Sequence, residues 1–475
     1  MIVGRTKEKK LLHQLLHSPK AEFLAVYGRR RVGKTYLIHE SCKDQGLYIE
    51  ITGSNKSNKQ QQLKNFHREF SVLCSSHSSA PKDWSEAFDR LLLFFQTIDK
   101  KKKIILFFDE LPWLASPKSG FLSALDYFWN RHFSRMENVF VIICGSAASW
   151  MIQKVINDKG GLYGRLSAEI RLLPFSLSEV EEFLLANHIS MNKKSIIELY
   201  MVLGGVAKYW THVIKGLSPA QIINQNCFTP QGPLFLEFSR LYQSLFDNPE
   251  KHINVVKALA KKRHGLTQIQ LLEAVALPYG GSSSLLLAEL EASGFICSSS
   301  QFGNEKKEKK FRLIDEYSYF YLSWIEKYKS QILQNADPHF FQKIQPSSSW
   351  ATWAGYTFEN ICLKHMENIK KALGISAVST IEYHWSSLEK GGAEIDLLID
   401  RADNCINLCE IKFCKNEFEI TASYAKELAR KKEQFLKKTK SQKNIFITLI
   451  TPYGAKKNSH YLEIIDQELT MENLF

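Results

Sequence analysis

The sequence lacks the features that mark secreted and membrane-spanning proteins. Its N-terminal stretch, MIVGRTKEKK, has no apolar segment of the length found in signal peptides. No apolar run reaches the ~18 residues that a membrane-spanning helix requires. The longest candidate, VFVIICGSAA at 139–148, has the length of a buried strand. We therefore expect a cytoplasmic protein without a membrane partner.

Cysteine pairs of the kind that bind zinc are also missing. The nine cysteines are odd in number and scattered between Cys42 and Cys414. Cys405, Cys409 and Cys414 lie close together in the sequence but form no paired CxxC motif, which disfavours a zinc site. The thiols of a cytoplasmic protein are expected to stay reduced.

The composition shows no shortage of apolar residues, which excludes a disordered chain. Hydrophobic residues make up 44% of the sequence and aromatic residues 12%. The length of 475 residues predicts about three domains. A net charge of +13 suits a polyanionic partner, with nucleic acid as the first candidate. The same charge equally fits a role in solubility alone.

A phosphate-binding motif is present near the N-terminus. Residues 23–40, FLAVYGRRRVGKTYLIHE, contain the pattern GxxxxGK[ST] between an apolar strand and a helical pattern. In that setting backbone N–H groups surround phosphate oxygens, Lys34 reaches the terminal phosphates and Thr35 ligates Mg²⁺. The residues predicted to contact the nucleotide here are Gly28, Arg29, Arg30, Arg31, Val32, Gly33, Lys34, Thr35 and Tyr36.

Two acidic residues, Asp109 and Glu110, end a second apolar strand. At such a strand end an Asp can hold Mg²⁺, and the adjacent Glu can orient or deprotonate an attacking water, which indicates hydrolysis. The alternative is a helix N-cap. Ser146, at the end of the next apolar strand, is a candidate sensor of the γ-phosphate. Arg165 either contacts the nucleotide or a neighbouring subunit, or is a plain surface residue.

Strands that alternate with helices around this loop predict a parallel α/β sheet with the nucleotide at its carboxyl edge. This half of the chain resembles the archaeal-type ATPases of the AAA+/STAND group. The matching segments are IVGR at 2–5 with Glu8, YGRRRVGKT at 27–35, LFFDE at 106–110, CGS at 144–146, LYGR at 162–165, LPFSLSE at 173–179 and GGVAKYW at 204–210. The resemblance implies ATP as the nucleotide and adenine contacts from residues 2–8. Ala207 stands where that family has a proline, so no nucleotide contact is carried over there.

The middle of the chain reads as a helical lid followed by a winged helix. Apolar residues at helical spacing fill 177–245, and from Ile253 the pattern becomes three helices and a hairpin. Thr267 and Gln270 predict a capping box. The third helix, SSSLLLAELEAS, has no basic residue, which favours a structural or intramolecular winged helix over one that reads bases. The hairpin tip, GNEKKEKK, can still contact phosphates.

Three charged residues lie in two strand-like apolar runs near the C-terminus. If their hairpin centres on Asp403, Asp396 faces Glu410, and Lys412 shares a strand face with Glu410. Two carboxylates can hold a divalent cation, and the lysine can activate a water or stabilise a phosphorane-like transition state. The alternative is a solvent-facing hairpin with an internal salt bridge.

This region, at about 340–455, resembles the PD-(D/E)xK restriction-endonuclease-like fold. The matching segments are WAGYTFENIC at 353–362, GGAEIDLLID at 391–400 and LCEIKF at 408–413. The resemblance implies metal ligands Asp396 and Glu410, the catalytic Lys412, and Glu359 as a further carboxylate. Glu394 and Ile395 stand where the motif's name expects a proline. Such folds include inactive members. A following stretch, KELARKKEQFLKKTKSQK at 426–443, has eight Lys or Arg against two Glu and suits a nucleic-acid backbone, or is a solvated helix face.

The sequence thus predicts an α/β multidomain protein. The expected parts are a P-loop ATPase core at 1–172, a helical lid at 173–248, a winged helix at 249–335 and a nuclease-like domain at 336–475. We expect ATP and Mg²⁺ as cofactors, nucleic acid (DNA first) as partner, a possible homo-oligomer, and a nucleotide state that controls a possible Mg²⁺-dependent endonuclease. The rivals are a signalling or scaffold ATPase with an inactive nuclease fold, and a helicase-like motor or loader.

Overall fold

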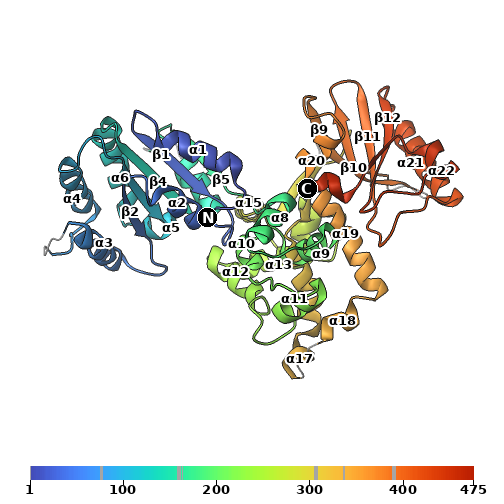
Figure 1. Cartoon of the computed structure of the whole chain (residues 1–475), viewed down its shortest axis with the longest axis horizontal. Coiled ribbons are helices and arrows are strands. Elements are labelled where there is room, and N and C mark those ends of the chain that lie inside the picture. Colours follow the sequence, from blue (N-terminus) through green and yellow to red (C-terminus); the bar gives the residue numbers. More distant parts are fainter. Residues whose placement is uncertain are drawn as a thin grey trace. The chain divides into compact units, whose positions relative to one another are not determined.

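The computed structural model divides the chain into two compact units, Met1–Pro174 and Phe175–Phe475 (Figure 1). It describes residues 2–74, 79–157, 162, 164–303, 309–334, 337, 339–387 and 392–475. No helix among these residues is long and apolar enough to cross a membrane. The division falls two residues after the predicted end of the ATPase core. The finer predicted division of the second unit stays a prediction.

The first unit is built on a five-stranded parallel sheet in the order β2-β3-β4-β1-β5. Its strands are β1 Glu22–Tyr27, β2 Leu47–Thr52, β3 Ile104–Asp109, β4 Val139–Gly145 and β5 Ala168–Arg171. Every residue of β1, β3 and β4 is buried, as expected for parallel strands covered on both faces. The predicted parallel α/β sheet is confirmed.

Helices cover both faces of this sheet (Figure 1). Helices α1 and α2 pack on one face, where Leu12 and Ile38 join the buried cluster that contains Val26. Helices α4 and α6 pack on the other face, where Phe88 and Phe121 contact Phe108 of β3. The helices of this unit are α1 Thr6–Leu16, α2 Lys34–Cys42, α3 Lys59–Cys74, α4 Trp84–Gln96, α5 Leu111–Leu114, α6 Phe121–Arg131 and α7 Ala148–Met151, with the short η1 Phe133–Arg135 and η2 Ile152–Ile156.

The second unit begins with helices over the span in which the sequence predicts them. They are α8 Leu177–Ala186, α9 Lys193–Leu203, α10 Ala207–Trp210, α11 Pro219–Cys227 and α12 Glu237–Leu245. Next come α13 Pro249–Ala260, β6 Leu266–Thr267, α14 Gln268–Ala274, α15 Gly281–Ala292, β7 Ile296–Ser300 and β8 Lys309–Leu313. The capping box of Thr267 and Gln270 at the start of α14 is confirmed. Most of the lysine-rich hairpin tip lies outside the described residues.

The C-terminal part of this unit holds a mixed sheet in the order β13-β12-β11-β10-β9. Its strands are β9 Thr380–Ser386, β10 Glu394–Arg401, β11 Cys405–Ile411, β12 Asn444–Ile450 and β13 Gln467–Leu469. The β10–β11 hairpin pairs Leu397 with Cys409 and Asp400 with Ile406, so it centres on position 403. The predicted hairpin centre at Asp403 is confirmed, and the paired residues end at Leu397 and Cys409, one position short of 396 and 410.

Two long helices enclose this sheet. Phe435 of α21 packs on one face, together with Ile395, Leu398 and Leu408. Helix α19 packs on the other face, where Phe358 shares a buried cluster with residues of β10 and β11. The remaining helices are α16 Glu316–Phe320, η3 Tyr321–Ile325, α17 Glu326–Gln334, α18 Phe340–Ile344, α19 Ser348–Lys364, α20 Met366–Ala372, α21 Ala422–Thr439, α22 Ser459–Ile464 and η4 Met471–Leu474.

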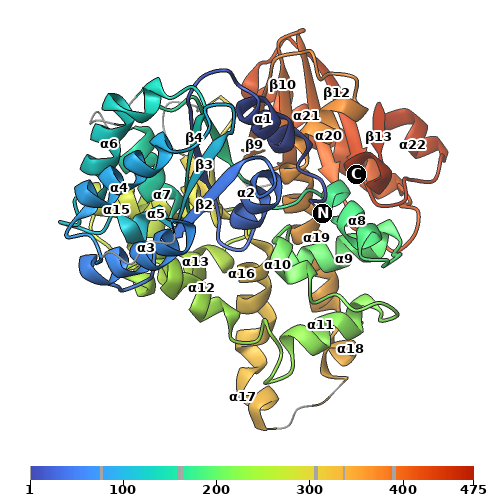
Figure 2. The ribbon, with the colours of Figure 1, turned by 60° about the vertical axis from the view of Figure 1, so that its left-hand side comes forward.

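One continuous apolar core runs through the second unit, from Phe175 to Leu474. Helix α18 lies beside α11, where Phe341 stacks on Phe228 (Figure 2). His365, after α19, accepts a hydrogen bond at Nε2 from the backbone N–H of Leu177 in α8, at 3.0 Å. The predicted lid and the nuclease-like part therefore pack directly against each other and share one core.

The β7–β8 hairpin also docks on the C-terminal sheet. The backbone N–H of Phe302 donates to the carbonyl of His384 at 3.2 Å, and Gln301 donates to the carbonyl of Ser386 at 2.9 Å. The ring of Phe302 contacts Tyr383 and Phe435. These contacts agree with an intramolecular role for this hairpin.

Candidate functional site

The phosphate-binding loop needs glycine where the chain turns most sharply. Gly28 has φ +146°, and a Cβ atom there would lie 2.3 Å from the carbonyl oxygen of Leu172. Gly33, which precedes α2, has φ +96°. Both conformations disfavour residues with side chains. The loop thus places the N-terminus of α2 at the carboxyl edge of the sheet, where helix N–H groups attract anions.

Lys34 is buried at the centre of this loop. Its ammonium donates to the carbonyls of Gly28 at 3.0 Å and Arg29 at 2.9 Å, and to Oγ of Ser146 at 3.1 Å. All three acceptors are neutral. The positive charge of Lys34 therefore remains available for the phosphates of a nucleotide.

The two predicted acidic residues lie beside the loop. Thr35 donates from Oγ1 to Oδ2 of Asp109 at 2.7 Å. Ser146 donates from Oγ to Oε1 of Glu110 at 2.8 Å. The structure thus brings together Lys34, Thr35, Asp109, Glu110 and Ser146, although 112 residues separate Lys34 from Ser146.

Glu110 has a strained backbone, with φ 48° and ψ 49°. This left-handed conformation costs a non-glycine residue about 1–3 kcal/mol, and such strain gathers at functional sites. Glu110 stands at the N-cap position of α5 but makes no side-chain capping bond. Its carboxylate points instead to Ser146, which argues against a mere helix cap.

The other predicted loop residues have different surroundings. Arg30 lies with its guanidinium 5.7 Å from the ring centre of Trp113. Val32 is buried in the core, and Tyr36 is 52% exposed on the first turn of α2. Arg29 is buried and Arg31 is exposed. Arg165 lies in an exposed turn before β5.

Residue-by-residue reasoning missed two neighbours of the loop. Trp113 follows the acidic pair by three residues and meets Arg30. Arg5 is buried and donates to the carbonyl of Val32 at 3.3 Å. Arg5 belongs to the 2–8 segment, for which adenine contacts are predicted. Trp113 could have been predicted as a neighbour of the loop, because it is an aromatic residue that follows closely after the acidic pair.

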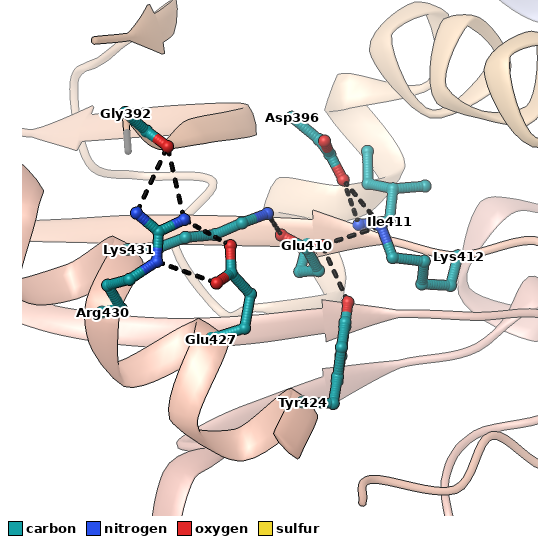
Figure 3. A network of polar contacts seen from close by, with 9 residues as sticks. All are labelled: Gly392, Asp396, Glu410, Ile411, Lys412, Tyr424, Glu427, Arg430 and Lys431. Atoms are coloured by element: carbon teal, nitrogen blue, oxygen red, sulfur yellow. Dashed lines mark hydrogen bonds and ion pairs between the residues drawn. The ribbon is translucent and has the colours of Figure 1, made fainter. Parts of the chain in front are cut away.

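Glu410 is the centre of the second candidate site (Figure 3). Its Oε1 accepts a hydrogen bond from the Tyr424 hydroxyl at 2.8 Å and lies 2.7 Å from Nζ of Lys412. Its Oε2 lies 2.7 Å from Nζ of Lys431. Burial acts to raise the pKa of Glu410, but the two ammonium groups outweigh it and hold that pKa below its usual value.

Asp396 lies on β10, beside the end of β11 that carries Glu410. Its Oδ2 accepts a hydrogen bond from the backbone N–H of Ile411 at 2.9 Å and lies 3.8 Å from Nζ of Lys412. Burial and the Glu410 carboxylate raise the pKa of Asp396. The structure therefore brings together Asp396, Glu410 and Lys412, as predicted.

Glu359 approaches from α19, on the side of Asp396. Burial and the charge of Asp396 raise its pKa to about 8. Its carboxylate lies 3.9 Å from the guanidinium of Arg312. Within the described ranges, no group of three or more His, Cys, Asp or Glu side chains is arranged to hold a metal ion. Glu359 is thus an electrostatic neighbour of the carboxylate pair.

Tyr424 and Lys431 are contacts that motif reasoning did not single out. Both lie on α21, which packs over the sheet face that carries Glu410. Lys431 belongs to the basic stretch at 426–443, so its charge was visible in the sequence. Its contact with Glu410 was not, because that contact depends on how α21 docks on the sheet.

Comparisons with known proteins match both parts of the chain. Residues 2–213 match a family described as an ATPase domain predominantly from Archaea. Residues 321–428 match a family described as archaea bacterial proteins of unknown function. The uncharacterized protein MJECL04 of Methanocaldococcus jannaschii is 25% identical over 375 residues, which cover 78% of either chain.

Two solved structures align distantly. The Walker-type ATPase PABY2304 of Pyrococcus abyssi is 16% identical, with a TM-score of 0.48 over 68% of this chain and 96% of that one. The ORC2 protein of Aeropyrum pernix, in its ADPNP-ADP complexes, is 14% identical, with a TM-score of 0.43 over 70% of this chain and 94% of that one.

The loop geometry and the match over residues 2–213 together identify an archaeal-type P-loop ATPase domain. The protein is therefore an ATPase.

Proposed function

We propose that this ATPase uses its nucleotide state to control a nuclease-like centre in its second unit, which binds and cuts nucleic acid, DNA first. The observation that carries the proposal is the meeting of Asp396, Glu410 and Lys412 at one end of the β10–β11 hairpin. The proposal also places the protein in the cytoplasm. Its possible homo-oligomer would use Arg165 either within its own subunit or across the interface.

In the first unit each proposed role follows from a contact. Lys34 binds the terminal phosphates, because only neutral groups hold its ammonium now. Glu110 positions the attacking water, and Ser146 links that carboxylate to Lys34 and senses the γ-phosphate. Thr35 and Asp109 offer the hard oxygen atoms that Mg²⁺ prefers, so they fit as its ligands. When bound, Mg²⁺ neutralises charge on the phosphate oxygens.

In the second unit Asp396 and Glu410 offer carboxylate oxygens of the same kind. A divalent cation held there would supply Lewis-acid stabilisation to a phosphodiester. Lys412 is charged and contacts both carboxylates, so it is placed to orient a water or to stabilise negative charge on the phosphate. Burial works against the ammonium form, but the adjacent carboxylates raise the pKa of Lys412 above its usual value.

Control by ATP requires a joint that can respond. The continuous core from Phe175 to Leu474 and the bond from Leu177 to His365 favour movement of the second unit as one body. We therefore propose that the responsive joint is at 173–174, between Leu172, which donates to the carbonyl of Tyr27, and Phe175, which donates to the carbonyl of Gly205. These contacts favour a hinge driven by nucleotide over a rearrangement inside the second unit.

The main alternative is a signalling or scaffold ATPase with an inactive nuclease fold. One observation favours it: Lys412, Lys431 and Tyr424 already engage both oxygens of Glu410. A metal ion would have to compete with two ammonium groups. Titration with Mn²⁺ distinguishes the two functions, and the paramagnetic effect of the ion on the protein reports its binding. Only the nuclease requires an Mn²⁺ site that is lost in Asp396→Ala.

The decisive experiment is cleavage of circular plasmid and of single-stranded DNA and RNA, with Mg²⁺ or Mn²⁺ and with or without ATP. We expect cutting that responds to ATP and is lost in Asp396→Ala and Lys412→Ala, while ATP hydrolysis continues in both variants. Lys456→Ala, which removes an exposed ion pair with Glu419, is the matched control. Cutting that survives Asp396→Ala would refute the nuclease centre.

A further inference from the structure

A polar pocket opens beside the proposed nuclease centre. It is a small opening, with an enclosed volume of about 20 Å³. Its walls come from the turn after α13, from strand β8 and from α19. The polar residues that line it are Lys262, Arg263, Arg312, Tyr319, Tyr356, Glu359 and Asn360. The pocket therefore forms where the predicted winged helix meets the nuclease-like part, inside the second unit.

Positive charge dominates this pocket. It is lined by three basic residues, Lys262, Arg263 and Arg312, against the single carboxyl of Glu359. Nε of Arg312 and Oδ1 of Asn360 are buried and have no hydrogen-bond partner among the described residues. A buried guanidinium nitrogen without a partner is costly, and an anion that accepted its hydrogen would relieve that cost.

Contacts hold the basic residues in position around the pocket. The guanidinium of Arg263 stacks 4.3 Å from the ring centre of Tyr356 on α19. The next residue, His264, contacts the carboxylate of Glu394, which lies two residues before Asp396 on β10. The turn that carries Arg263 is thus fastened to both α19 and the strand of the carboxylate pair.

Glu359 connects the pocket to the proposed centre. It lines the pocket and lies 3.9 Å from Arg312, and its carboxyl also interacts with the charges of Asp396 and Lys412. A phosphate group bound at the mouth of this pocket would therefore lie beside Glu359, whose carboxyl interacts with the charge of Asp396.

We propose that Arg263 and Arg312 bind a backbone phosphate of the nucleic-acid strand and thereby position the adjoining phosphodiester at Asp396, Glu410 and Lys412. The inference rests on the proposed nuclease function. It assigns two positioning residues from the predicted winged helix to a centre whose carboxylates come from the C-terminal sheet. Arginine suits this role because its planar guanidinium can donate two parallel hydrogen bonds to a phosphate.

The test measures binding of a short fluorescent DNA, single-stranded and duplex, to the full chain by anisotropy, in EDTA so that no cutting occurs. The variants are Arg263→Gln and Arg312→Gln. Lys251→Gln, which removes an exposed charge on α13 outside the pocket, is the matched control. We expect each pocket variant to weaken binding about tenfold, as for the loss of a charged hydrogen bond.

The dependence on salt supplies a second readout. Each lost phosphate contact should reduce the slope of log K against log salt by roughly 0.7–0.9. Pocket variants that bind and respond to salt like Lys251→Gln would overturn the inference. Thermal unfolding shows whether Arg312→Gln is folded. If it is not, DNA binding by Arg263→Gln, which changes an exposed residue, is the test of the inference.

Cleavage with Mg²⁺ then separates the two proposals. Loss of binding in the pocket variants, together with no cutting by the wild type, would overturn the nuclease but support the phosphate pocket. Normal cutting by both pocket variants would overturn the pocket but support the nuclease. Weak binding together with slow cutting in the same variants would support both.

Discussion

The two candidate sites of this protein both place lysine beside acidic residues, but they balance charge in opposite ways. Lys34 is held by two carbonyls and a hydroxyl, so its charge has no anionic partner among these contacts. Lys412 and Lys431 both contact the carboxylate of Glu410. The first site can therefore bind an anion directly. In the second site the charges already pair with one another, so a metal cation would have to compete with the lysines for Glu410, or a polyanion would have to compete with Glu410 for the lysines.

The sites also differ in how the chain builds them. The loop from Gly28 to Thr35 is one short segment, and its backbone conformation positions the groups that bind phosphate. The second site draws Asp396 and Glu410 from a hairpin and Lys431 from a later helix. A local site tolerates change elsewhere, while an assembled one depends on the packing of its elements.

The largest effect is expected from Lys34→Ala, which removes the uncompensated charge of the first site. ATP hydrolysis should fall by roughly 100- to 1,000-fold, the range seen when one group that stabilises a transition state is lost. Phosphate release by the purified chain measures this. Lys10→Ala, an exposed charge on α1, is the control and should hydrolyse ATP like the wild type. Comparable rates in both variants would contradict the assignment of Lys34.

Glu410→Gln should remove the negative charge that the lysines of the second site contact, and so lower the free energy of unfolding of the protein. The change leaves Lys431 without the carboxylate it contacts and Lys412 with only the more distant carboxylate of Asp396. Disruption of such a buried pair costs about 3 kcal/mol. We take the low end of the usual range because Lys412 is 35% exposed. Urea unfolding measures the loss. Glu419→Gln, which breaks the exposed pair with Lys456, should change stability little, and equal losses in the two variants would refute the comparison.

A smaller effect, which depends on pH, should come from His365 in the core of the second unit. Burial lowers its pKa from 6.5 to about 4, so the unfolded state takes up a proton before the folded state does. This contribution to stability is present above pH 6.5 and is lost as the pH falls toward 4. Urea unfolding at pH 7 and pH 5 should show a smaller loss for His365→Gln than for the wild type.

His384 must be considered in that experiment, because burial also lowers its pKa to about 4. Some loss of stability on acidification should therefore remain in His365→Gln. His384→Gln gives the complementary measurement. An identical loss at pH 5 in the wild type and in His365→Gln would show that the contact with Leu177 does not depend on the neutral ring.

Much of the fold followed from local patterns. The P-loop, the apolar strands and the capping box at Thr267 depend on neighbouring residues, and the hairpin register followed from its centre at Asp403. The docking of the β7–β8 hairpin on β9 could not be predicted. It joins segments about 80 residues apart through a backbone hydrogen bond from Phe302 and a bond from the Gln301 side chain. Neither bond can be read from the local sequence pattern.

The sequence alone determined the chemistry that each site can offer: a lysine and glycines in a phosphate loop, an acidic pair after a strand, and two carboxylates with a lysine in a hairpin. The tertiary structure decided which charges meet. Lys34 contacts Ser146, and Glu410 contacts Lys431, only when the helices pack on their sheets. The reason is physical, because backbone conformation and residue type are local, whereas electrostatic pairing depends on distances that packing alone sets.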